Sequence, residues 1–152
     1  MFAATDNLKY TGMELQVNNK ITISELQRQF SKEFPYLKIE FFDIPHSSPN
    51  KLSKAHLFPP NRLLGVCRKL RNEGIIKISP DDTVEKLETI FWNEFGLSAE
   101  VFRRSGNVWI ETSLSNSWTL KLQNEEGKAL SDGRYKRTID DDQDMTDRDM
   151  WR

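Results

Sequence analysis

Residues 76–112 read IKISPDDTVEKLETIFWNEFGLSAEVFRRSGNVWIET, and this stretch predicts the fold. It begins with a short apolar strand. Thr83 can then cap a helix whose apolar residues recur at the spacing of one helical face. A second strand, residues 99–103, turns through Ser105-Gly106-Asn107 into a third, residues 108–112. The stretch therefore predicts a strand–helix–strand unit that continues into a hairpin over residues 99–112.

The same plan occurs earlier in the chain, over residues 15–42. A shift of 61 positions matches the apolar and capping residues of the two stretches, and one residue is lost before the last strand. The apolar helix positions recur at i, i+3, i+7 and i+11 in both copies, which indicates one buried stripe on each helix. We therefore predict that residues 15–42 and 76–103 are duplicated units. The matches include Leu15 with Ile76, Thr22 with Thr83, Leu26 with Leu87, Phe30 with Phe91 and Phe34 with Phe95.

Two such units and a hairpin predict an α+β fold. If the units interleave in an open sheet with the helices on one face, the arrangement is ferredoxin-like. A β-grasp is the alternative, because residues 80–87 (PDDTVEKL) resemble the helix start of ubiquitin-like proteins. We expect a single domain over residues 13–130, with a flexible N-terminus at 1–12, a loop at 43–60, a helix at 62–72 and a disordered acidic tail at 131–152.

Residues 118–130 fit either a strand or a short helix. The residues Trp118, Leu120 and Leu122 alternate as in a strand, but residues 123–128 are poor strand formers. We therefore favour the helix.

The composition bounds the function. Of 152 residues, 37% are hydrophobic and 30% charged, and the net charge is −1, unlike a strongly basic protein that coats nucleic acid. The apolar runs are far shorter than the roughly 20 residues that span a bilayer. The single Cys67 cannot form an intrachain disulfide, so we expect a cytoplasmic protein. The sequence identifies no partner, pathway or oligomeric state.

Few residues suggest chemistry. His46, His56 and Cys67 could in principle form a nucleophile–base pair or part of a zinc site, but their spacing matches no ligand pattern. Asp140, Asp142 and Asp144 resemble the opening of a calcium loop whose glycine and closing glutamate are missing. We therefore predict no catalytic residue, no metal site and no cofactor, and we keep as a third alternative an enzyme whose site the sequence does not reveal.

Strand alternation predicts one outward face with aromatic and charged side chains. Val101, Arg103, Val108, Ile110 and Thr112 should face the helices. The opposite face should carry Phe102, Arg104, Trp109 and Glu111, joined by Glu40 and Phe42 if the strands share a sheet. We predict a partner-binding surface made of Phe42, Phe102, Arg104, Trp109 and Glu111.

This surface has three interpretations. The C-terminal part of the chain could cover it with Trp118, a protein partner could bind it, or single-stranded nucleic acid could stack on its aromatic rings. A basic set on the predicted helix 62–72 could bind phosphate or an acidic partner: Arg62, Arg68, Lys69 and Arg71. We favour a non-catalytic cytoplasmic protein-interaction or regulatory module, with a weak single-stranded nucleic-acid binder as the alternative.

One resemblance extends over residues 21–127. Phe95-Gly96-Leu97, residues 101–112 (VFRRSGNVWIET) and Trp118-Thr119-Leu120 are similar to a family of small uncharacterised bacterial proteins. The turn at Ser105-Gly106-Asn107 with its flanking aromatic residues is the most distinctive part. The family has no known activity, so the resemblance implies no functional residue.

Overall fold

Both expected strand–helix–strand stretches are present. The computed structural model describes residues 11–45, 48, 54–68 and 72–132. The first stretch comprises β1 (Met13–Val17), α1 (Ile23–Glu33) and β2 (Leu37–Phe42). The second comprises β3 (Gly74–Ile78), α3 (Val84–Phe95) and β4 (Ser98–Ser105). The other elements are η2 (Lys54–His56), α2 (Leu64–Cys67), β5 (Val108–Glu111), η3 (Ser113–Ser115) and α4 (Leu120–Ser131).

Local sequence signals explain where α1 and α3 begin and end. The Thr22 hydroxyl accepts the backbone N–H of Glu25 at 3.2 Å, and the Glu25 carboxylate accepts the N–H of Thr22 at 3.2 Å, so the capping box is complete. Thr83 caps α3 through its own hydroxyl. Pro35 follows α1. α3 ends at Gly96, whose φ of 64° favours a residue without a Cβ.

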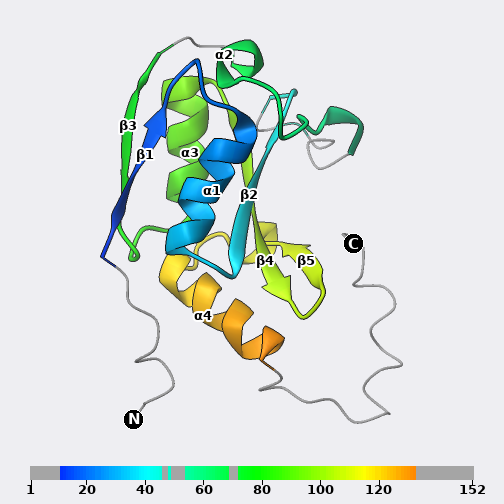
Figure 1. The fold of residues 1–152 in the computed structure, drawn as a ribbon. Helices are drawn as coiled ribbons and strands as arrows, with labels where there is room; N and C mark the ends of the chain where they lie inside the picture. Colours follow the sequence, from blue (N-terminus) through cyan, green and yellow to red (C-terminus); the bar gives the residue numbers. More distant parts are fainter. Residues whose placement is uncertain (1–10, 46–47, 49–53, 69–71, 133–152) are drawn as a thin grey trace.

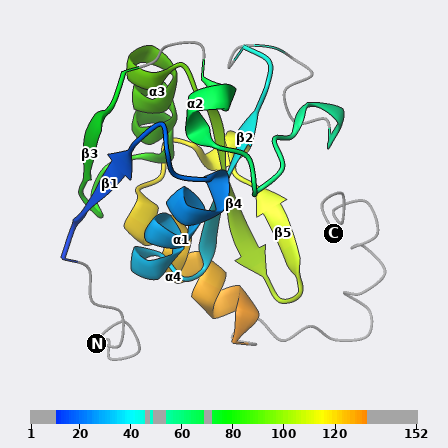
Figure 2. The same ribbon diagram turned by 45° about the horizontal axis from the view of Figure 1, so that its top comes forward.

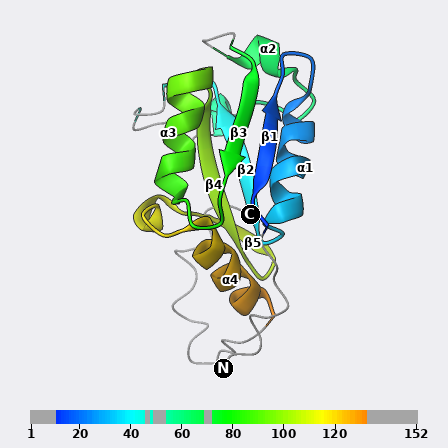
Figure 3. The ribbon, with the colours of Figure 1, turned by 90° about the vertical axis from the view of Figure 1, so that its left-hand side faces the viewer.

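The strands form two antiparallel sheets rather than one. β1 pairs with β3, and the second sheet has the order β2–β4–β5. Helices α1 and α3 lie between the two sheets (Figure 1), and Figure 3 looks onto the β1–β3 pair with a helix at each side. The described residues are therefore α+β with four α-helices and two small open sheets. They show neither the predicted ferredoxin-like arrangement nor the β-grasp alternative, each of which is built on a single sheet.

Equivalent positions of the two stretches lie opposite each other. Leu15 faces Ile76 at the middle of the β1–β3 pair, and Glu40 faces Glu100 in the β2–β4 pair. In each pair, the residue one position before the centre of one strand lies opposite the residue one position after the centre of the other strand, and the reverse is also true. Two similar units facing each other about a local twofold axis give such a register, whereas interleaved units give a single sheet. This explains the difference from the predicted arrangement.

Backbone bridges join the starts of the helices in two equivalent pairs. The start of α1 meets the start of α2, which lies above it in Figure 2, and the start of α3 meets the start of α4. α4 therefore occupies in the second half the position that α2 occupies in the first. In the first pair, the N–H of Leu64 donates to the carbonyl of Ile21 at 2.8 Å, and the N–H of Ile23 donates to the carbonyl of Arg62 at 2.9 Å. In the second pair, the N–H of Leu120 donates to the carbonyl of Asp82 at 2.8 Å, and the N–H of Val84 donates to the carbonyl of Trp118 at 3.2 Å.

α4 confirms the helix expected in residues 118–130. Its N-cap is Thr119, whose hydroxyl accepts the N–H of Leu122. The helix packs against the start of β2, where the buried Asn124 side chain accepts the N–H of Tyr36 at 2.8 Å. A Cβ on Gly127 would lie 2.8 Å from the Tyr36 Cβ, so glycine permits this close approach.

Two segment boundaries differ from the sequence prediction. The helix expected at 62–72 is wrong in extent, because α2 has only four residues and Arg68 after it is extended. Ser131 belongs to α4, so the acidic tail cannot begin at 131. The remainder of that tail, residues 133–152, and residues 1–10 of the predicted flexible N-terminus lie outside the described residues.

The core fills the layer between the two sheets. Phe30 of α1 and Phe91 of α3, at equivalent positions, are both fully buried. The Phe91 ring meets that of Phe41 edge to face, with 5.3 Å between ring centres. The inner faces of both sheets contribute Leu15, Val17, Ile76, Ile78, Leu37, Ile39, Ala99 and Val101.

Candidate functional site

The outer face of the β2–β4–β5 sheet is assembled as the strand alternation predicts. Lys38 lies opposite Phe102, which lies opposite Glu111, and Arg104 lies opposite Trp109. All five predicted partner-binding residues therefore share one face, which confirms their placement, while their role in binding stays a prediction. The complete face carries Lys38, Glu40, Phe42, Ser98, Glu100, Phe102, Arg104, Trp109 and Glu111.

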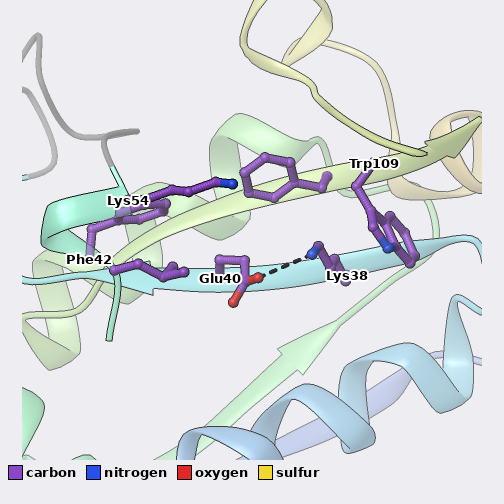
Figure 4. A pocket seen from close by; sticks show the side chains of 7 residues that line it. Lys38, Glu40, Phe42, Lys54 and Trp109 are labelled. Atoms are coloured by element: carbon purple, nitrogen blue, oxygen red, sulfur yellow. Dashed lines mark ion pairs between the residues drawn. The ribbon is translucent and has the colours of Figure 1, made fainter. Parts of the chain in front are cut away.

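A pocket of about 170 Å³ opens on this face. Figure 4 shows Lys38, Glu40 and Phe42 following one another along β2, with Trp109 beside Lys38 and Lys54 reaching in from the other side. Aromatic rings thus stand at both ends of a short recess, and cationic side chains lie between them. The lining residues are Lys38, Glu40, Phe42, Lys54, Leu57, Phe102 and Trp109.

Lys38 organises the charges of the pocket. Its ammonium lies 3.1 Å from a carboxylate oxygen of Glu40, and the two side chains are 30% and 18% exposed. The same ammonium is 5.5 Å from the ring centre of Phe102 and 5.1 Å from that of Trp109, within range of cation–π attraction. The Gln27 side chain donates to Glu40 at 2.8 Å. These contacts hold Lys38 and Glu40 in place, because each has more than one partner.

Lys54 and Leu57 are pocket residues that the sequence analysis missed. They belong to the segment predicted only as a loop, residues 43–60. Leu57 forms a backbone bridge with Phe42, and the N–H of Phe58 donates to the carbonyl of Phe41 at 2.9 Å. The segment thereby lies against the end of β2. The one sequence signal for this contact is the apolar pair Leu57-Phe58 within a polar loop.

The face is partly covered. Phe42 and Phe102 are each only 2% exposed, whereas Trp109 is half-buried and Arg104 is exposed. Of the three interpretations, cover of this face by Trp118 is wrong. Trp118 lies over Arg103, with 5.6 Å from the guanidinium to the ring, and Arg103 points to the opposite face of β4. Trp109 is therefore the accessible aromatic residue of the pocket.

Arg103 is held on the inner face by α4. Its guanidinium donates to the buried Gln123 side chain at 2.9 Å. Burial lowers the pKa of Arg103, and the nearby Glu126 partly opposes this effect. Arg103 thus has a structural role, in contrast to Arg104 beside it.

At the β5 end of the face, Arg104 and Glu111 differ in how they are held. The Arg104 guanidinium lies 6.0 Å from the Trp109 ring and donates to the carbonyl of Gly106 at 2.9 Å. The Glu111 carboxylate accepts the N–H and the hydroxyl of Ser113. Arg104 has no ion-pair partner among the residues that the structure describes.

Of the predicted basic set, the structure describes Arg62 and Arg68, and these two do not share an exposed helix face. Arg68 is 6% exposed, and its guanidinium donates to the carbonyl of Asn72 and to the side chain of Asn19. Arg68 therefore ties two segments of the chain together and is not available to phosphate. Arg62 is exposed and lies 5.9 Å from the Phe58 ring. Lys69 and Arg71 lie outside the described residues.

Among the described residues, no contact joins His56 and Cys67. Cys67 is buried, its thiol donates to the carbonyl of Leu63 at 3.3 Å, and burial raises the pKa of the thiol to about 11 against the opposing effect of Arg62. His56 lies 3.0 Å from the Asp43 carboxylate instead. His46 lies outside the described residues. Within those residues, no group of three or more metal-ligating side chains was found.

Comparison with protein-family models, curated proteins and solved structures gave no match to this chain. The resemblance to the small bacterial proteins therefore stays a prediction. Among the helices that the structure describes, none has the length and apolar character needed to cross a membrane.

Proposed function

We propose that the protein is a non-catalytic binding module that recognises a segment of another protein on the outer face of β2–β4–β5. The pocket between Phe42, Phe102 and the half-buried Trp109 is the observation that carries this proposal. Its volume of about 170 Å³ is below the roughly 300–1,000 Å³ of small-molecule sites, and it suits one side chain. Aromatic pockets that receive a single side chain are typical centres of protein interfaces.

The charged side chains around the pocket favour a partner segment that places an apolar side chain in the pocket and an acidic residue next to it. Lys54 and Arg104 have no ion-pair partner in the described part of the chain, whereas Lys38 is paired with Glu40. An acidic residue of a partner would meet these two cations. Such charge complementarity favours specificity and a rapid encounter.

Single-stranded nucleic acid is the alternative that the aromatic residues raise. Trp109 with Arg104 and Lys38 resembles a base-stacking platform. However, the same face carries the carboxylates of Glu40 and Glu111, which would repel phosphates. We therefore favour a protein partner.

Two further proposals concern origin and location. We propose that the two strand–helix–strand stretches arose by duplication, which the reciprocal register and the paired helix-start bridges support. We also propose a cytoplasmic location, on the basis of the single Cys67.

Selection of short random peptides against the immobilised full-length protein tests the proposed function. We expect enriched peptides that share an aromatic or aliphatic residue flanked by Asp or Glu. Trp109→Ala should weaken their binding by at least about tenfold, because truncating a central interface tryptophan commonly costs 2 kcal/mol or more. Lys54→Glu should also weaken the binding of these peptides. Ile75→Ala is the matched control, since Ile75 is exposed on the outer side of the other sheet.

Two results would contradict the proposal. One is peptide binding that Trp109→Ala leaves unchanged. The other is binding of a homopolymeric oligonucleotide that depends on Trp109 and falls steeply with salt, which would favour the nucleic-acid alternative.

A further inference from the structure

In the part of the chain that the structure describes, the outer edge of β5 is unpaired. β5 is the last strand in the order β2–β4–β5, and no other strand of the described residues pairs with it. The hairpin has a two-residue turn, so Ser105–Val108 and Arg103–Ile110 are its hydrogen-bonded pairs. The N–H and C=O groups of Trp109 and Glu111 consequently point away from β4. No donor or acceptor meets them in the part of the chain that the structure describes.

Side chains of α1 bond to backbone groups along the edges of β2 and β1. Along the outer edge of β2, Gln27 donates to the carbonyl of Ile39 at 2.8 Å and Ser31 donates to that of Leu37 at 3.0 Å. Along β1, Gln29 accepts the N–H of Gln16 at 3.1 Å. Such cover protects a strand edge from pairing with another chain. Within the described residues, no side chain covers the edge of β5 in this way, and this edge lies beside Trp109, the accessible aromatic residue of the pocket.

The side chains of β5 suit a strand with alternating character. A strand paired with β5 would direct alternate residues to the two faces of the sheet. One set would lie beside Val108 and Ile110, which are half-buried, and the other beside Trp109. The Arg104 cation on the outer face lies 6.0 Å from the Trp109 ring and has no carboxylate partner in the described residues. Arg104 would attract an acidic residue among those that lie beside Trp109.

We propose that the partner binds as an extended segment that adds to the sheet beside β5. Its apolar residues pack next to Val108 and Ile110, and an acidic residue on the outer face meets Arg104. Main-chain hydrogen bonds to Trp109 and Glu111 supply affinity, and the alternate side chains supply specificity. This inference rests on the proposed function and states how the partner enters.

A pair of substitutions at position 111 tests the strand addition. Glu111→Pro removes the outward N–H and leaves the bonds to β4 intact, because proline is tolerated at a strand edge. Glu111→Ala removes the same carboxylate but keeps the N–H. The probe is an end-blocked peptide in which valine and threonine alternate and one threonine is replaced by aspartate. The control peptide has lysine in place of the aspartate.

Binding is measured by NMR titration of the isotopically labelled full-length protein. Both variants lack the Glu111 carboxylate, so the difference between them reports the N–H alone. We expect Glu111→Pro to bind the probe about tenfold more weakly than Glu111→Ala, the upper range for the net effect of one hydrogen bond. The lysine peptide should bind more weakly than the probe. In the unmutated protein, the probe should slow hydrogen exchange at the Trp109 and Glu111 amides, a result that does not depend on the variants folding.

The outcomes separate this inference from the proposed function. If the selected peptides depend on Trp109 but the probe leaves exchange at the two amides unchanged, strand addition is wrong while the binding module stands. Equal affinity of Glu111→Pro and Glu111→Ala would lead to the same conclusion. Amide shifts that follow protein concentration alone would assign the edge to a second copy of this chain and overturn the inference. If no peptide depends on Trp109, both proposals fail.

Discussion

The β1–β3 and β2–β4 pairs are built alike but present different outer surfaces. Each is antiparallel and centred on two equivalent residues, Leu15 with Ile76 and Glu40 with Glu100. The outer side of β1–β3 carries Glu14, Gln16, Ile75 and Lys77, all of them exposed. The outer side of β2–β4 includes Phe42 and Phe102, which are buried.

Segments outside the two strand–helix–strand stretches account for the difference. The second sheet gains β5 on one side, which supplies Trp109, and the segment with Lys54 and Leu57 lies over the end of β2. No described segment has the corresponding position over β1–β3. The pocket therefore depends in part on segments outside the two strand–helix–strand stretches, and the proposed binding should be sensitive to changes in those segments and indifferent to changes on the first sheet.

The largest expected effect tests whether the two halves share an equivalent core. Phe30→Ala and Phe91→Ala should each lower the free energy of unfolding by about 3–5 kcal/mol, because each removes a fully buried aromatic ring. Urea unfolding of both variants under the same conditions measures this. Losses that differ by several kcal/mol would show that the halves are not energetically equivalent.

An intermediate effect separates the two outer surfaces. Trp109→Ala should cost about 1–2 kcal/mol, since the ring is only half-buried and loses part of its contact area. Ile75→Ala should stay within about 0.5 kcal/mol, as is usual for an exposed position. Thermal or urea unfolding gives both values. A loss of about 4 kcal/mol for Trp109→Ala would instead mean that the chain covers this ring completely.

The smallest effect concerns Cys67 in α2, the helix that corresponds in position to α4. Cys67→Ala should cost roughly 1 kcal/mol, an ordinary value for one core change. The thiol pKa is about 11 in the folded protein against 9.0 ordinarily. The unfolded chain therefore releases this proton first as the pH rises, and the thiol's contribution to stability should fall between pH 9 and 11.

Comparing unfolding of the natural chain and Cys67→Ala across this pH range isolates that contribution. At neutral pH, alkylation of Cys67 should be much slower in the native protein than in urea, because the thiol is both buried and protonated. Rapid alkylation of the native protein would show that the helix around Cys67 opens readily.

Much of the local structure could be predicted from the sequence. The cap at Thr22 and the face shared by Phe102 and Trp109 follow from hydrogen bonding and side-chain alternation within a few residues. The five candidate partner-binding residues were placed on one face for the same reason. Helix α2 was predicted too long, because the polar residues after Cys67 fit a helix pattern although Arg68 is buried in an extended segment.

The sequence by itself determined the order and type of most elements and the side of each strand that faces the core. Only the tertiary structure decided which strands pair, that the helices lie between two sheets, and that Lys54 and Leu57 join the pocket. The physical reason is the range of the interactions. Helix caps and strand alternation depend on near neighbours, whereas pairing Glu40 with Glu100 or Leu57 with Phe42 depends on how whole layers pack against each other.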